Sequence, residues 1–277
     1  MTSRRRLGWA ASAVVLLLLA PACAPARVSL PTGPGEPLPA AERDAIAEQA
    51  FSTCAGVQTL TAELGLSGRA GRQRLRGRLI AGIAAPGSIR LEGVAPFGPP
   101  VFILAASPGR STLLLPRDDR VLFDAEPGEI LEALAGLALG PDDLLSVLAG
   151  CPSREPVVRR GRRHGDAWTA FELGDGSEAY VRRLAGTWRL IALVRPALTI
   201  EYAELEGSRP ALVRLVSRAT GPAAFDLRVR LSQVELNAEV PEAAFRVTVP
   251  PEARPISLDE LRDAGPMRDA SGETAAR

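Results

Sequence analysis

Residues 57–83 read VQTLTAELGLSGRAGRQRLRGRLIAGI, and their two-residue periodicity decides the fold. In the first half, alternate positions are apolar and would share one face of an extended strand: Leu60, Ala62, Leu64 and Leu66. A glycine-rich turn at residues 68–71 follows. In the second half Leu75 and Leu79 share the apolar face, while Arg74, Arg76 and Arg78 occupy the other. The stretch therefore predicts an antiparallel hairpin with one apolar and one solvated face.

The same alternation continues along the chain on the C-terminal side. Strands are predicted at residues 89–94, 101–107, 111–115, 120–123, 168–173, 179–184, 188–194, 198–204, 212–216, 225–236 and 245–249. The apolar phase slips between Leu231 and Val234, which indicates a bulge in that strand. Some neighbouring segments are expected to merge, giving about eleven strands. The fold class expected is mainly β (α+β), with one antiparallel curved sheet.

Helical spacing replaces alternation in three places. Residues 41–53 carry an apolar stripe at helical spacing and predict an N-terminal helix. Residues 127–139 and 141–148 are leucine-rich, and each begins with a proline suited to a first helical turn. These two short helices would form a lid inserted midway through the sheet. No boundary within residues 41–258 resembles a linker, so a single domain is expected.

The N-terminus is typical of an exported lipoprotein. Arg4, Arg5 and Arg6 precede an apolar run at residues 9–20, which is too short to span a bilayer core of about 30 Å. Small residues then lead to Cys23, which would become the acylated (palmitate-bearing) first residue of the mature chain. We expect residues 1–22 to be a lipoprotein signal peptide; ordinary cleaved secretion and an uncleaved anchor are the alternatives. Residues 23–40 would be a proline-rich linker.

Two further cysteines, Cys54 and Cys151, each end a predicted helix. An oxidising compartment outside the cytoplasm favours a disulfide between them. The alternative is a pair of separate buried thiols.

Composition gives little support for catalysis. Arginine and lysine (33) nearly balance aspartate and glutamate (32), so no strong overall field would recruit nucleic acid or anionic lipid. The only histidine, His164, lies in a charged run at residues 159–166, which we expect to be a solvated loop. The alternative for its four arginines is a contact for anionic headgroups or an acidic partner. A zinc site would lack ligands. Asp118–Asp119 and Asp142–Asp143 suit a turn and a first helical turn. We expect no enzyme, no metal and no cofactor.

An apolar sheet face and a leucine-rich cover could enclose a cavity for acyl chains. Its expected lining is Leu64, Leu66, Leu75, Leu79, Ile130, Leu131, Leu134, Leu144, Leu145 and Leu148. The alternative is a core that these side chains fill completely.

Several short motifs resemble one family in their order along the chain. They are Pro96-Phe97-Gly98 after a strand, a Pro108-Gly109 turn, the element at residues 148–152 and the run at residues 245–251. Over residues 41–261 the chain resembles the LolB-like outer-membrane lipoprotein receptors of the LolA/LolB-like carrier superfamily. The polar tail at residues 262–277 lies outside the resemblance.

The resemblance implies a half-open β-barrel with a helical lid and an apolar cavity for lipoprotein acyl chains. It also implies a periplasmic LolA-like carrier as donor, and a membrane-insertion loop formed by Pro96, Phe97 and Gly98, where the family usually carries leucine. Such a protein would be a monomer, lipid-anchored to the outer membrane and facing the periplasm. A carrier of another lipid or glycolipid, and a non-transporting envelope sensor or interaction protein, are the alternatives.

Overall fold

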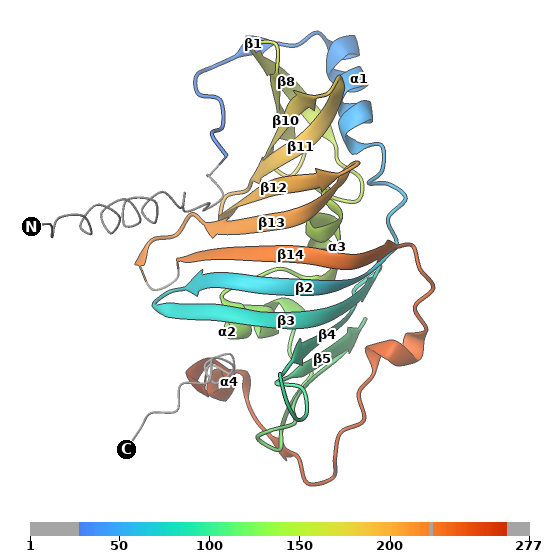
Figure 1. Cartoon of the computed structure of the whole chain (residues 1–277), viewed down its shortest axis with the longest axis vertical. Coiled ribbons are helices and arrows are strands. Elements are labelled where there is room, and N and C mark those ends of the chain that lie inside the picture. The colour runs from blue at the N-terminus through green and yellow to red at the C-terminus, as the bar shows by residue number, and fades with distance from the viewer. Residues whose placement is uncertain (1–27, 222–223, 265–277) are drawn as a thin grey trace, which may run out of the picture.

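The computed structural model describes residues 28–221 and 224–264, which form one sheet with helices packed against it (Figure 1). The expected signal peptide, the lipidation site Cys23 and most of the polar tail lie outside these residues. The sheet has fifteen strands in the order β1-β8-β9-β10-β11-β12-β13-β14-β2-β3-β4-β5-β6-β7-β15. Every neighbouring pair is antiparallel except β15 with β7. The fold class is confirmed: mainly β, one open curved sheet with few helices.

Most elements lie where the sequence periodicity predicted them, and the exceptions are given below. The strands are β1 Glu36–Pro37, β2 Thr59–Ala70, β3 Gln73–Ala84, β4 Ser88–Val94, β5 Ile103–Ser107, β6 Arg110–Leu115, β7 Arg120–Phe123, β8 Val158–His164, β9 Trp168–Leu173, β10 Glu178–Leu184, β11 Thr187–Val194, β12 Leu198–Glu206, β13 Arg209–Ser217, β14 Phe225–Leu236 and β15 Arg254–Pro255. The helices are α1 Ala40–Phe51, α2 Pro127–Ala135, α3 Pro141–Ala149, the 3₁₀ turn η3 Glu242–Phe245 and α4 Leu258–Ala264.

The predicted hairpin is β2–β3, in which Leu64 pairs with Leu79 and Leu66 with Gly77. Burial alternates along β2, as expected for a strand with one face covered by helices and the other in solvent. The predicted bulge in β14 is also present, because its pairing with β2 shifts between Ser232 and Glu235. Gln233, at the shift, has a positive φ of 51°.

α1, α2 and α3 pack on one face of the sheet (Figure 1), whereas η3 packs on the other face of β4, where Arg90 Nη1 donates to the Ala244 carbonyl. α1 covers β11 and β8, and α3 crosses β13, β2, β3 and β4. α2 packs on α4. After its first turn α3 is buried on all sides, from Leu144 to Ala149, because the sheet curves around it. None of the helices in the described part of the chain is long and apolar enough to cross a bilayer.

A disulfide joins Cys54 to Cys151, as the sequence predicted, with a Cα–Cα distance of 5.6 Å. Cys54 follows α1 and Cys151 follows the C-terminal end of α3. The bond therefore ties the two helices together on the covered face of the sheet.

Four expectations require correction. The sheet has fifteen strands rather than about eleven. The charged run expected as a loop is strand β8, in which Arg162 and Arg163 form ion pairs with Glu178 and Glu42. Residues 245–249 are not a strand; Phe245 ends the turn η3. Finally, β1 lies within the expected linker and α4 extends into the expected polar tail.

Candidate lipid-binding interior

The ten residues predicted to line a cavity all come together in one place. Nine of them are buried and Leu79 is half-buried, and all belong to or pack against a single apolar core. β2 and β3 contribute Leu64, Leu66, Leu75 and Leu79 from the sheet, and α2 and α3 contribute the other six. Sequence periodicity thus identified the apolar interior correctly.

α3 occupies the concave side of the sheet within this interior. Leu145 is 0% exposed, and Leu148 is 1% exposed. Four surface depressions formed by the described residues are lined by other side chains.

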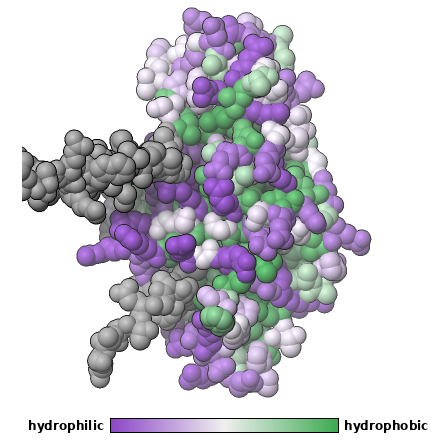
Figure 2. Space-filling model, in the orientation of Figure 1, coloured by the Kyte–Doolittle hydropathy of each residue, from purple (hydrophilic) through white to green (hydrophobic). Residues whose placement is uncertain are grey.

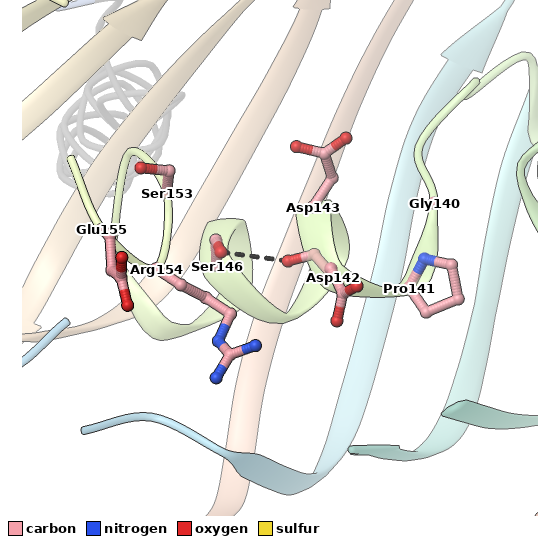
Figure 3. A pocket seen from close by; sticks show the side chains of 8 residues that line it. All are labelled: Gly140, Pro141, Asp142, Asp143, Ser146, Ser153, Arg154 and Glu155. Atoms are coloured by element: carbon pink, nitrogen blue, oxygen red, sulfur yellow. Dashed lines mark hydrogen bonds between the residues drawn. The ribbon is translucent and has the colours of Figure 1, made fainter. Parts of the chain in front are cut away.

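One of these depressions, about 710 Å³ in volume, lies beside the first turn of α3 and is shown in Figure 3. It is lined by Gly140, Pro141, Asp142, Asp143, Ser146, Ser153, Arg154 and Glu155. The Ser146 hydroxyl donates a hydrogen bond to the Asp142 carbonyl across 3.0 Å within the helix. The charged lining does not suit an acyl chain.

α3 is held at both ends by polar or covalent bonds. At its start Arg195 Nη1 donates to Asp143 Oδ1 across 3.0 Å, and the Gly87 amide donates to Asp142 Oδ1 across 3.2 Å. Both aspartates lie in the first helical turn, as predicted. At its end the Cys54–Cys151 disulfide fixes the chain. These bonds make α3 the fixed part of the cover.

α2 is held differently. Its buried side is apolar, with Ile130, Leu131 and Leu134, and its opposite side faces solvent. Within the described part of the chain, no side chain of α2 makes a hydrogen bond or ion pair. The helix ends at Gly136, which is left-handed with φ 73°. In the described part of the chain, the side chains of α2 therefore make apolar contacts only.

The C-terminal end of α2 lies against the ends of β2 and β14. A Cβ added to Gly136 would be 3.9 Å from the Cβ of Ala70 and 3.8 Å from Cδ1 of Phe225. Ala70 ends β2 and Phe225 begins β14. The C-terminal end of α2 therefore meets the sheet at the turn end of the β2–β3 hairpin.

Tyr202 on β12 is a polar residue of this interior that the sequence analysis did not identify. It is buried in the core, and its hydroxyl has no hydrogen-bond partner among the residues described. Burial raises the pKa of the phenol well above its usual value, an effect that Arg195 opposes. The hydroxyl is thus a neutral donor that could bind a carbonyl oxygen, such as that of an acyl ester.

The Phe97 loop connects β4 to β5, and its tip stands in solvent. Phe97 is 89% exposed, and Pro96 and Gly98 are exposed beside it. Arg117 braces the loop from the turn between β6 and β7. Its Nη2 donates to the Phe97 carbonyl across 2.9 Å, and its Nε donates to the Pro99 carbonyl across 3.3 Å. No local sequence signal links Arg117 to this loop.

Among known proteins, similarity to this chain was found only with solved structures. No protein-family model and no curated protein matches the sequence. A LolA superfamily protein from Nitrosomonas europaea is 10% identical, with a TM-score of 0.46, covering 74% of this chain and 97% of its own. An outer-membrane lipoprotein-sorting protein domain from Vibrio parahaemolyticus is 10% identical, with a TM-score of 0.45 and coverages of 73% and 94%. The Mycobacterium tuberculosis lipoprotein LppX is 10% identical, with a TM-score of 0.31 and coverages of 73% and 99%.

Proposed function

We propose that this protein is a lipid-anchored carrier that takes acyl chains into its interior beneath α2. One observation supports the proposal above the others: an apolar sheet face is closed by a helix, α2, that only apolar contacts hold. Displacement of α2 would expose leucines of both the sheet and α3. A guest chain would replace the side chains of α2 as their apolar partner.

Exchange of this kind needs no nucleotide. Each CH₂ transferred from water into an apolar site contributes about 0.8 kcal/mol. When an acyl chain passes from one apolar site to another, these contributions nearly cancel. A small difference in affinity between donor, carrier and membrane is then enough to set the direction.

Location and cargo are part of the same proposal. The anchor would be Cys23, and the protein would face the periplasm from the outer membrane as a monomer without catalytic activity. Acyl chains of lipoproteins, delivered by a LolA-like donor, are the cargo we favour. Another lipid or a glycolipid would fit the same interior.

A second candidate follows from the packing of α3. Because α3 is buried against the concave face in this structure, the protein could be a tethered interaction protein that carries nothing. Such a protein would keep its cover closed in every functional state. Whether α2 must open therefore separates the two candidates.

A disulfide engineered between Ala70→Cys and Gly136→Cys would test this. The 3.9 Å separation of the two Cβ positions lies within the range of about 3.5–4.5 Å found in disulfides. We expect the oxidised variant to lose binding of a pyrene-labelled fatty acid by at least about tenfold, and mild reduction to restore it. Fluorescence titration of both forms, in a chain beginning at Ala24, measures the effect; that chain retains every described element.

Each single variant serves as a control for the lock. Gly136→Cys alone should lower the free energy of unfolding by about 1–2 kcal/mol, because it places a side chain at positive φ, but it forms no cross-link. The native disulfide is almost fully buried, so mild reductant reaches the engineered one first. Equal binding by oxidised and reduced forms would exclude entry beneath α2. No binding by the unmodified protein would favour the interaction protein.

The Phe97 loop gives a separate prediction for delivery. Phe97→Glu should abolish insertion into vesicles, because a carboxylate at the tip cannot enter the apolar layer, while fatty-acid binding stays unchanged. Phe123→Glu is the matched control, since Phe123 is also exposed, at 46%, but lies at the other end of β7 from this loop. Vesicle flotation measures insertion; normal flotation of Phe97→Glu would remove the loop from the delivery step.

A further inference from the structure

Five arginines gather at the turn end of the β2–β3 hairpin. They are Arg69, Arg72, Arg74, Arg76 and Arg228. The first four are exposed and Arg228 is half-buried. Among the residues that the structure describes, no hydrogen bond or ion pair involves any of their side chains. Figure 2 shows hydrophilic side chains projecting where this hairpin ends in Figure 1.

Strand pairing forces these charges together. Arg69 lies directly opposite Arg74 across the hairpin. Ser67 pairs with Arg76 on one side and Arg228 on the other, so these two arginines share one row of the sheet. Like charges directly opposite each other destabilise a sheet. The Nε atom of Arg228 is also buried without a hydrogen-bond partner, a further cost.

Several other arginines of the sheet form ion pairs. Arg214 binds both Asp226 and Glu201, with Nη–carboxylate distances of 2.5 and 3.3 Å. Arg230 pairs with Glu204, and Arg90 with Glu92. None of the five arginines at the hairpin end has such a pair among the described residues, so positive charge is concentrated there in a chain whose formal net charge is only +1. A costly local arrangement of this kind is expected where a protein binds a partner.

The arginines share an end of the sheet with the Phe97 loop. β2 and β4 run in the same direction because each is antiparallel to β3. Val94 pairs with Arg78, and the loop that carries Phe97 begins immediately after Val94. Arg74 and Arg76 continue β3 toward the same end. Four residues at about 3.3 Å each separate Arg76 from Arg72 in the turn, so all of these arginines lie within about 13 Å of the end of the hairpin.

We propose that these five arginines, the arginine face, bind the phosphate groups of an anionic lipid bilayer. Guanidinium groups bind phosphate through paired hydrogen bonds. The exposed apolar tip Phe97 at the same end favours a bilayer over an acidic protein. No aromatic residue is interleaved with the five arginines on their strand face, which disfavours single-stranded nucleic acid. The inference shares only the orientation of the Phe97 loop with the proposed function and does not need a bound acyl chain.

Flotation of the Ala24–Arg277 chain with phosphatidylcholine vesicles, with and without phosphatidylglycerol, tests the proposal. Each arginine near an anionic surface contributes about fivefold in affinity, so R69Q/R74Q/R76Q should bind phosphatidylglycerol vesicles about 100-fold more weakly. The control R159Q/R160Q/R183Q removes three exposed arginines from β8 and β10 and should change binding less than about tenfold. Added salt should weaken the binding of the unmodified protein to phosphatidylglycerol vesicles. It should also reduce the difference in affinity between the unmodified protein and R69Q/R74Q/R76Q.

If both triple variants lost vesicle binding equally, net charge alone would explain the loss, and the proposal would be overturned. Binding that ignores phosphatidylglycerol would overturn it as well, as would binding of an acidic polypeptide in preference to the vesicles. Binding of pyrene-labelled fatty acid, measured in the same variants, keeps the two proposals apart. Normal fatty-acid binding with lost vesicle binding supports the arginine face. Lost fatty-acid binding with normal vesicle binding would count against the carrier alone.

Discussion

Replacement of Cys54 and Cys151 by alanine is expected to lower the free energy of unfolding by about 4–5 kcal/mol. The disulfide closes a loop with a sequence separation of 97, so its loss returns much conformational entropy to the unfolded chain. For a domain of this size the melting temperature should fall by roughly 10–20 °C. Urea denaturation of the Ala24–Arg277 chain, monitored by circular dichroism, measures the change.

The single variants provide the internal control for the disulfide. Cys54→Ala and Cys151→Ala each open the same loop, so each alone should cost nearly as much as the double replacement. Full reduction of the unmodified protein should produce the same loss. A loss below about 1 kcal/mol would mean that other contacts fix the end of α3.

Leu145→Ala should lower the free energy of unfolding by about 2–5 kcal/mol. Leu145 is fully buried between α3 and the sheet, so truncation removes apolar contacts and leaves a cavity. If the interior accepts acyl chains, a saturating long-chain fatty acid should recover part of this stability, because ligand that binds only the folded state stabilises it. Thermal melts with and without fatty acid measure both effects.

Leu184→Ala is the control for this substitution, since Leu184 lies at the exposed end of β10. It should change stability by less than about 0.5 kcal/mol, as expected for surface positions, and should not respond to fatty acid. A Leu145→Ala protein that is destabilised but unaffected by fatty acid would support the tethered interaction protein instead.

Periodicity predicted most of the sheet because most strands have one buried and one solvated face. Even the β14 bulge was visible, as a phase slip before Val234. β8 was missed because its inward position is Gly161, between arginines, and carries no apolar signal. β1 and β15 have two residues each and exist only through their pairing with β8 and β7. Such pairing depends on tertiary contacts that no local pattern contains.

The candidate site was predicted in part for the same reason. Alternation and helical spacing identify which aliphatic residues face inward, and all ten predicted lining residues meet in one core. They do not reveal how much space remains, because packing depends on the position of α3 relative to the sheet. Arg117 was missed because the Phe97 loop that it contacts is distant in sequence. Tyr202 was missed because the residues that bury it are distant in sequence as well.

The pairing of β1 with β8 limits how far an anchored molecule could reach. Glu36 and Pro37 are hydrogen-bonded into the edge of the sheet, so only residues 24–35 would separate the sheet from an acylated Cys23. Fully extended, a segment of this length spans at most about 40 Å, comparable to the roughly 40–45 Å thickness of one bilayer with its headgroups. An anchored molecule with so short a tether would stay close to its own membrane, and cargo would have to reach it there.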